Sequence, residues 1–240
     1  MRARHLLAAL AATALLAVPA AEAQAQQRRA ARPAVAQDWT RVAVRTAEGV
    51  RMGNPAAQVR VVEYGSITCP HCALFANEGG TAGLYRHVRT GRVSWEYRPY
   101  MIFPTDPGLF AALNCLPPTA FFPVVEQLYA TQRTWMGRVQ AYLQANQQQV
   151  VAMNNSGRAL AMFRASQVEG LFRARGMTSA QLNACVGNIA NLRRVADATR
   201  SASQRLNIPG TPTFYVNGVA AEGVGEWAQL EPLLVRAGAR

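Results

Sequence analysis

The sequence contains no lysine, so all of its basic charge comes from arginine. Its 240 residues include 25 basic and 13 acidic side chains, and the formal net charge is +12 at pH 7. A nucleic-acid-binding surface would need these arginines in clusters, interleaved with exposed aromatic side chains. They are instead scattered singly, apart from Arg28–Arg29 and Arg193–Arg194. The pattern argues against a nucleic-acid partner and is typical of a genome that favours alanine and arginine codons. A basic face for acidic or membrane-proximal partners is the alternative.

Long apolar runs are also lacking, and none beyond the N-terminus approaches the roughly 20 residues that a membrane-spanning helix needs. The short run Leu6–Val18 follows two arginines and precedes Ala21-Glu22-Ala23, a small-x-small sequence. This pattern predicts a secretory signal peptide over residues 1–23, cleaved after Ala23 or, alternatively, after Ala25. An uncleaved membrane anchor is the other interpretation. We expect export to the periplasm, where disulfides are permitted.

Cysteine is scarce, with four residues in a chain of 26.0 kDa. A chain of this size can bury a core without the help of disulfides. Cys69 and Cys72 form the motif Cys-Pro-His-Cys, whereas Cys115 and Cys185 are isolated. A structural zinc site usually has close-spaced ligands from both of its halves. The isolated pair therefore argues against zinc, and we predict no metal and no cofactor.

The first part of the chain divides into a leader and a β-α-β unit. Residues 24–57 begin with an Ala/Gln/Arg/Pro-rich stretch that predicts a flexible leader, followed by an N-terminal strand or hairpin. Residues 58–104 alternate strand, helix and strand, which is the beginning of a parallel β-α-β unit. The expected strands and helical segments of this unit are Val59–Tyr64, Ala73–Asn77, Thr81–Val88 and Val93–Met101.

The remaining chain is predominantly helical before it returns to strands. Residues 105–187 repeat apolar side chains at helical spacing without a strand, and this predicts an α-helical insertion. Residues 188–240 give a helix, a strand, a hairpin turn at Asn217–Gly218 and a closing helix. The fold class is therefore α/β, with an inserted α-helical domain.

The Cys-Pro-His-Cys motif lies where a strand gives way to a helix. If Cys69 begins the helix, unpaired backbone N–H groups and the helix dipole stabilise its thiolate and lower its pKa. Pro70 suits the first helical turn, because its missing N–H costs nothing there. His71 can add a hydrogen bond or a positive charge to the same sulfur. We expect an exposed nucleophile at Cys69 and a shielded resolving thiol at Cys72, nearly one turn later.

Two further features accompany the motif. Glu63 interrupts an apolar strand, where a carboxyl group held in a low dielectric would exchange protons with Cys72; a solvent-facing strand edge is the alternative. Near the other end, Thr211-Pro212 leads directly into a strand. If this peptide bond is cis, the loop can approach the cysteines and Thr211 can pair with an extended substrate peptide. An ordinary turn is the alternative.

Together, these residues resemble the thioredoxin-fold disulfide oxidoreductases of the bacterial periplasm, the DsbA-like proteins, over roughly residues 58–240. Cys-Pro-His-Cys is the DsbA active-site sequence, and the helical insertion is similar too. The resemblance implies a thioredoxin fold with Cys69 as nucleophile, Cys72 as resolving thiol and His71 as thiolate stabiliser. It also implies that Glu63 is a buried acid/base and that Thr211-Pro212 is a cis-proline loop.

The resemblance further implies a monomeric dithiol oxidase that donates its disulfide to unfolded or reduced exported proteins. A DsbB-like, quinone-linked membrane partner would reoxidise it. Thr211 departs from the best-known oxidases, which have valine before the cis-proline, and is shared with many isomerase-type relatives. A disulfide isomerase or reductase therefore stays an alternative, although such isomerases carry an N-terminal dimerisation domain. A non-enzymatic peptide-binding chaperone is a third hypothesis.

Cys115 and Cys185 both lie in the predicted insertion. Four cysteines allow three pairings. We favour a structural disulfide between these two residues that ties two insertion helices together. The alternative is a regulatory disulfide that tunes the redox balance of Cys69 and Cys72.

Overall fold

The computed structural model describes residues 37–239. The predicted signal peptide, its cleavage site and most of the Ala/Gln/Arg/Pro-rich leader lie outside these residues. In the part of the chain that the structure describes, no helix is both long enough and apolar enough to cross a bilayer.

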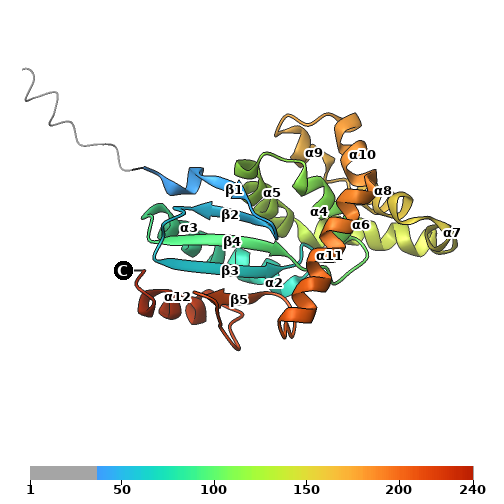
Figure 1. The fold of residues 1–240 in the computed structure, drawn as a ribbon. Coiled ribbons are helices and arrows are strands. Elements are labelled where there is room, and N and C mark those ends of the chain that lie inside the picture. The colour runs from blue at the N-terminus through green and yellow to red at the C-terminus, as the bar shows by residue number, and fades with distance from the viewer. Residues whose placement is uncertain (1–36, 240) are drawn as a thin grey trace, which may run out of the picture. The chain divides into compact units, whose positions relative to one another are not determined.

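One mixed sheet organises the described residues, with strand order β1-β2-β4-β3-β5-β6 (Figure 1). The central strands β3 and β4 are parallel, as the predicted β-α-β unit requires, and the other neighbours are antiparallel. The predicted N-terminal strand or hairpin corresponds to β1 and β2, which extend the sheet beyond β4. The strands are β1 (Ala43–Arg45), β2 (Val50–Gly53), β3 (Val59–Gly65), β4 (Val93–Pro99), β5 (Thr213–Val216) and β6 (Val219–Ala220).

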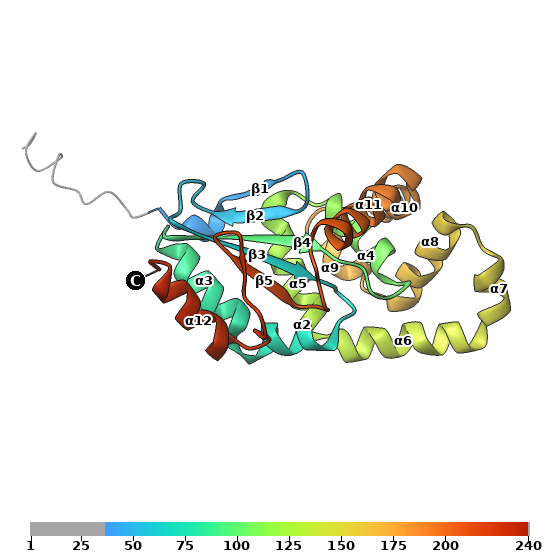
Figure 2. The ribbon, with the colours of Figure 1, turned by 60° about the horizontal axis from the view of Figure 1, so that its bottom comes forward.

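Three helices next to the sheet come from the parts of the chain before and after the helical insertion. Helices α2, α3 and α12 lie on one side of the sheet (Figure 2). A π-helical turn, η2, joins α2 to α3, and Gly79 within it has a φ of 99°, which breaks the helix between the two expected segments. A positive φ of this kind is easily adopted only by glycine. The bounds of these elements are α2 (Pro70–Phe75), η2 (Ala76–Gly80), α3 (Thr81–Arg89) and α12 (Trp227–Arg236), and a 3₁₀ turn, η1 (Trp39–Arg41), precedes β1.

Seven helices and no strand occupy residues 106–187 of the described chain, followed by the long helix α11. Helix α11 packs against α4 and α8 of this insertion and also reaches β4, so it connects the insertion back to the sheet. Thr178 and Gln181 form a capping box at the start of α10. The helices are α4 (Asp106–Asn114), α5 (Pro118–Ala130), α6 (Gln132–Ala145), α7 (Gln147–Ala152), α8 (Asn155–Ser166), α9 (Glu169–Arg173), α10 (Ser179–Gly187) and α11 (Ile189–Arg205).

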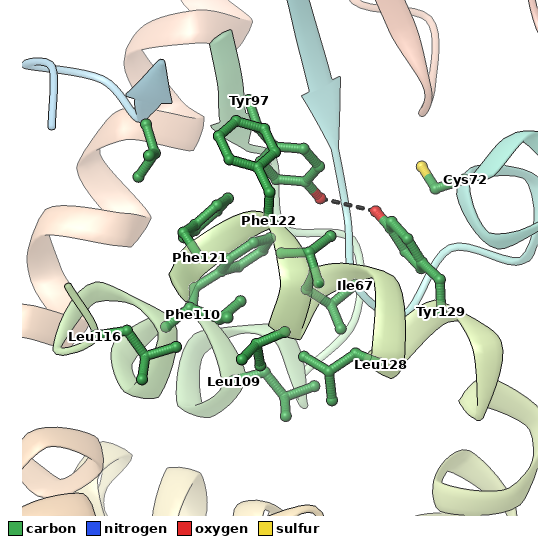
Figure 3. Close-up of a cluster of buried hydrophobic side chains, with 14 of the residues drawn as sticks. Ile67, Cys72, Tyr97, Leu109, Phe110, Leu116, Phe121, Phe122, Leu128 and Tyr129 are labelled. Carbon is green, nitrogen blue, oxygen red and sulfur yellow. Dashed lines mark hydrogen bonds between the residues drawn. The ribbon is translucent and has the colours of Figure 1, made fainter. Parts of the chain in front are cut away.

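A buried aromatic cluster joins the insertion to the sheet. Phe110 and Phe121 contact the ring of Tyr97, with centroids 6.3 and 5.6 Å away (Figure 3). Ile67, which follows β3, is fully buried in the same cluster. Burial of large apolar side chains is the main favourable term in folding. The cluster therefore holds the end of β3 firmly against the insertion, just before the Cys-Pro-His-Cys motif.

One strand boundary differs from the expectation. The alternation of residues 93–101 predicted a strand as far as Met101, but β4 ends at Pro99. Pro99 pairs with Gly65, the last residue of the neighbouring β3, so the ladder has no partner strand beyond this point. The chain leaves the sheet there and enters the insertion.

Candidate active site

Cys69 is the N-cap residue of α2, with extended φ and ψ of −74° and 121°. Pro70 occupies the first helical turn, as its fixed φ favours. The Cys69 carbonyl accepts the first bond of the helix from the Ala73 N–H, at 3.2 Å. The Cys69 sulfur therefore belongs to the residue that begins α2, at the end of the helix where the first backbone N–H groups have no partner within the helix.

The prediction that Cys69 is exposed is wrong, because the residue is only 3 % exposed. The loop that contains Thr211 and Pro212 covers it, and the Cys69 thiol donates a hydrogen bond to the Thr211 carbonyl at 3.0 Å. The exposed residues of the motif are Pro70 and His71. Covering from a loop 142 residues away in sequence could not be read from the motif itself.

The two thiols have opposite pKa shifts. The pKa of Cys69 is lowered to about 5, first by a hydrogen bond from the Cys72 thiol and then by the side chain of Thr211 and the backbone N–H groups of Cys72 and His71. Burial acts against this shift but does not overcome it. Burial raises the pKa of Cys72 well above its ordinary value, and the residue is fully buried. Near neutral pH, Cys69 is therefore the ionised member of the pair.

His71 contributes to the site through its main chain. Its backbone N–H stabilises the Cys69 thiolate, whereas the residue itself is exposed on the surface. The sequence prediction assigned this effect to the imidazole ring. The backbone N–H groups of the first helical turn supply such an effect, as expected for a helix N-terminus, and a role of the imidazole ring stays a prediction.

Glu63 is buried on the central strand β3 and only 2 % exposed, so the solvent-facing alternative is wrong. Its carboxylate accepts a hydrogen bond from the Trp95 indole N–H at 3.0 Å. Burial raises the pKa of Glu63 to about 8, the Trp95 hydrogen bond opposes this shift, and the negative charge of Cys69 adds to it. The charge of Glu63 in turn helps to raise the pKa of Cys72. The carboxyl group and both thiols therefore form one electrostatically coupled site.

The Thr211–Pro212 peptide bond is cis. Strand β5 follows directly and pairs with β3, with Thr213 opposite Tyr64 and Phe214 opposite Glu63. This pairing brings the loop to the start of α2. The Thr211 hydroxyl oxygen is buried and has no hydrogen-bond partner among the described residues, which leaves its proton available to the sulfur when Cys69 is ionised.

A buried carboxylate that sequence reasoning missed supports the loop before Cys69. Asp106, at the start of α4, is fully buried. The backbone N–H and hydroxyl of Thr68 and the hydroxyl of Ser66 donate to its carboxylate at 2.9–3.2 Å. The backbone N–H groups of Ile102 and Phe103 complete the set. A local signal existed, since an aspartate before a proline suits a first helical turn, but nothing in the sequence pointed to its distant partners.

A buried tyrosine pair, also missed, lies beside Cys72 (Figure 3). The hydroxyls of Tyr97 and Tyr129 are 2.8 Å apart, and the Tyr129 hydroxyl donates to the Ser66 carbonyl at 3.1 Å. A Cβ atom on Gly65 would lie 2.6 Å from the Tyr97 hydroxyl. Only glycine therefore fits at the end of β3 next to this pair.

The predicted disulfide between Cys115 and Cys185 is present. It connects the C-terminal cap of α4 to α10, with the two Cα atoms 6.4 Å apart. Both residues belong to the insertion, while Cys69 and Cys72 are free thiols. Within residues 37–239, no group of three or more histidine, cysteine or acidic side chains could hold a metal ion.

Residues 45–235 match the family described as Thioredoxin. The chain belongs to the thioredoxin family. A crystal structure of a protein-disulfide isomerase from Novosphingobium aromaticivorans is similar, at 31 % identity and a TM-score of 0.71. The alignment covers 78 % of this chain and 96 % of that one. The predicted fold class, a thioredoxin fold with an α-helical insertion, is thereby confirmed.

Two further comparisons agree with this fold. The Wolbachia pipientis alpha-DsbA1 crystal structure shares the fold, with a TM-score of 0.59 at 16 % identity, covering 78 % of this chain and 89 % of that one. A Rickettsia typhi protein, provisionally named a protein-disulfide oxidoreductase, is 22 % identical over 71 % of this chain and 55 % of its own length. The chain spans about half the length of the curated relatives it matches.

Proposed function

We propose that this protein is a thiol:disulfide oxidoreductase of the DsbA type that donates a Cys69–Cys72 disulfide to exported proteins. The observation that carries the proposal is the Cys69 sulfur at the start of α2, whose pKa is lowered to about 5. A reduced state stabilised as a thiolate makes the corresponding disulfide a stronger oxidant. The family and its relatives support the same reaction class.

The reaction proceeds by two exchanges. A substrate thiolate attacks the Cys69 sulfur of the oxidised protein, the Cys69–Cys72 bond breaks, and Cys72 leaves and takes up a proton. A second substrate thiolate attacks the substrate sulfur of the mixed disulfide, a substrate disulfide forms, and Cys69 leaves as a thiolate. Two electrons pass from the substrate to the protein. A low pKa makes Cys69 a good leaving group in the second exchange.

Glu63 and Cys72 determine where the proton goes when the Cys69–Cys72 bond breaks. Because burial raises the pKa of Cys72 well above its ordinary value, this thiol is protonated after the first exchange. A protonated thiol is a poor nucleophile, so Cys72 does not attack the mixed disulfide and return the substrate unchanged. Glu63, whose pKa of about 8 lies near physiological pH, is the acid/base for this proton.

The substrate and its compartment follow from the same proposal. An extended segment of an unfolded, reduced protein pairs with the backbone of Thr211, whose loop contacts the reactive sulfur. The signal sequence over residues 1–23 directs the protein to the periplasm, where it acts as a monomer. A DsbB-like, quinone-linked membrane partner accepts the two electrons and restores the disulfide.

The test uses the ultraviolet absorbance of the thiolate in the reduced protein as a function of pH, with Cys69→Ser as the blank. We expect a transition near pH 5 that this substitution removes. The oxidised protein should also transfer its disulfide to a reduced, unfolded protein, whereas Cys72→Ser, which cannot form the Cys69–Cys72 disulfide, should not. A Cys69 pKa near about 8.5, the value of a free cysteine, would contradict the oxidase proposal.

A disulfide isomerase or reductase is the second candidate. Two observations favour it, namely Thr211 before the cis-proline and the 31 % identity to a structure described as a protein-disulfide isomerase. Equilibration with glutathione buffers distinguishes the candidates. A reduction potential well below that of glutathione indicates a reductase, and repair of scrambled disulfides by a dimer indicates an isomerase.

A further inference from the structure

The helical insertion contacts the backbone directly before the nucleophile. Three buried side chains from three insertion helices bind the segment Ser66–Cys69. Asp106 of α4 and Tyr129 of α5 bind its first part, as described above. Gln132, the first residue of α6, binds its last part. The segment is therefore held from outside the β-α-β unit that contains the cysteines.

Gln132 makes the contact nearest to the reactive sulfur. Its side-chain nitrogen donates to the Ile67 carbonyl at 2.8 Å and to the Cys69 carbonyl at 2.9 Å. An amide nitrogen carries two hydrogens, so both donors are used. The residue is 5 % exposed, and α6 starts beside α2 (Figure 2). No other side chain among the described residues donates to the Cys69 carbonyl.

The direction of the Cys69 carbonyl affects the geometry of the first turn of α2. It also accepts the first helical bond, from the Ala73 N–H, so its direction and the first turn of α2 are linked. Pro70 has no N–H, which leaves the N–H groups of His71 and Cys72 as the backbone donors to the sulfur. Hydrogen bonds weaken steeply as their angles depart from linearity. The donors therefore reach the thiolate only while the first turn keeps its orientation.

We propose that Gln132 is a positioning residue that, by holding the carbonyls of Ile67 and Cys69, keeps the Cys69 sulfur aligned with the N–H groups of α2. The helical insertion thereby controls the reactivity of the thiolate through one side chain. This role rests on the proposed function. It makes the reactivity of Cys69 depend on a residue outside the cysteine motif.

The test compares Gln132→Leu and Gln132→Met with the wild type in the full chain. Both variants roughly keep the volume of the glutamine side chain but remove its two hydrogen-bond donors. We expect the Cys69 pKa, followed by thiolate absorbance, to rise by about one unit, a tenfold change in the thiol–thiolate ratio at a given pH. The reduction potential should fall accordingly, because the reduced state loses stabilisation.

Asn191→Leu is the matched control. Asn191 of α11 is also a buried amide, and its nitrogen donates to the carbonyls of Ala111 and Cys185 at 3.0 and 3.3 Å, within the insertion. This variant should lose stability without moving the Cys69 pKa. A common loss of stability in all three variants with an unchanged Cys69 pKa would show that Gln132 is only structural.

The remaining outcomes are also decisive. If neither Gln132 variant folds while Asn191→Leu does, Gln132 is a folding determinant and the proposal is overturned. If the wild type itself shows an ordinary Cys69 pKa, the oxidase proposal fails first. A low wild-type pKa that both folded Gln132 variants retain rejects the positioning role alone.

Discussion

Replacement of Glu63 by glutamine should make the reduced protein less sensitive to alkaline pH. The carboxyl group is 2 % exposed, and burial raises its pKa from 4.5 to about 8. The folded state therefore binds the proton more tightly than the unfolded state. The resulting stability is fully present below pH 4.5 and is lost as the pH rises to about 8.

The magnitude follows from this shift. A separation of 3.5 between the two pKa values (8 − 4.5) costs about 5 kcal/mol once the carboxyl is ionised in both states. Between pH 6 and pH 9, linkage gives about 3 kcal/mol of this loss. A glutamine side chain has the same shape as the glutamate and could still accept the Trp95 hydrogen bond, but it does not ionise. The stability difference between E63Q and the wild type should thus grow by about 3 kcal/mol over this pH range.

Urea unfolding of both reduced proteins at several pH values measures this difference. Because Cys69 titrates in both, its own contribution largely cancels. Glu222→Gln, which removes an exposed carboxylate, is the control and should follow the wild type. Parallel curves for E63Q and the wild type would refute the assignment of Glu63 as a carboxyl group that is protonated near neutral pH.

Three further predictions concern the thiols. Thr211→Val removes the buried hydroxyl beside the sulfur and should raise the Cys69 pKa, measured by thiolate absorbance, by about one unit. An unchanged value would exclude the hydroxyl as a donor. The reduced protein should lose about 3 kcal/mol relative to the oxidised protein from pH 7 to pH 4, because the folded pKa of Cys69 is depressed to about 5 and its stabilisation disappears as the pH falls. Denaturant unfolding of both redox forms tests this sign, and an increase on acidification would contradict it. Removal of the second disulfide by Cys115→Ala and Cys185→Ala should lower the free energy of unfolding by about 4 kcal/mol. The Cys69 pKa of this double variant should stay constant if the disulfide is structural, and should shift if it is regulatory.

Local patterns predicted the parts of the site that are local in sequence. The start of α2 at Pro70 followed from the strand-to-helix change and the position of the proline. Burial of Glu63 followed from the apolar strand around it, with the edge-strand alternative open until the sheet order placed β3 between β4 and β5. In both cases, neighbouring residues carry the information.

Most of the contacts that the sequence did not predict involve partners distant in sequence. Trp95 is buried in the core, and its indole N–H donates to Glu63 across the parallel β3–β4 pair. Asp106 and Gln132 reach the segment before Cys69 from helices of the insertion. The loop that covers the Cys69 sulfur contains Thr211. Such contacts depend on how strands pair, how loops return to the sheet and how helices pack onto it, which residue spacing along the chain does not encode.

The hydrogen bond from the Cys69 thiol to the Thr211 carbonyl would link ionisation to the proposed peptide recognition. A thiolate has no proton to donate, so each ionisation releases an acceptor on the backbone edge that an incoming strand would use. Below a pH of about 5 the thiol and a peptide would compete for the same oxygen, and above it they would not. The sulfur would thus become reactive and its docking edge would become vacant when the thiol loses a single proton.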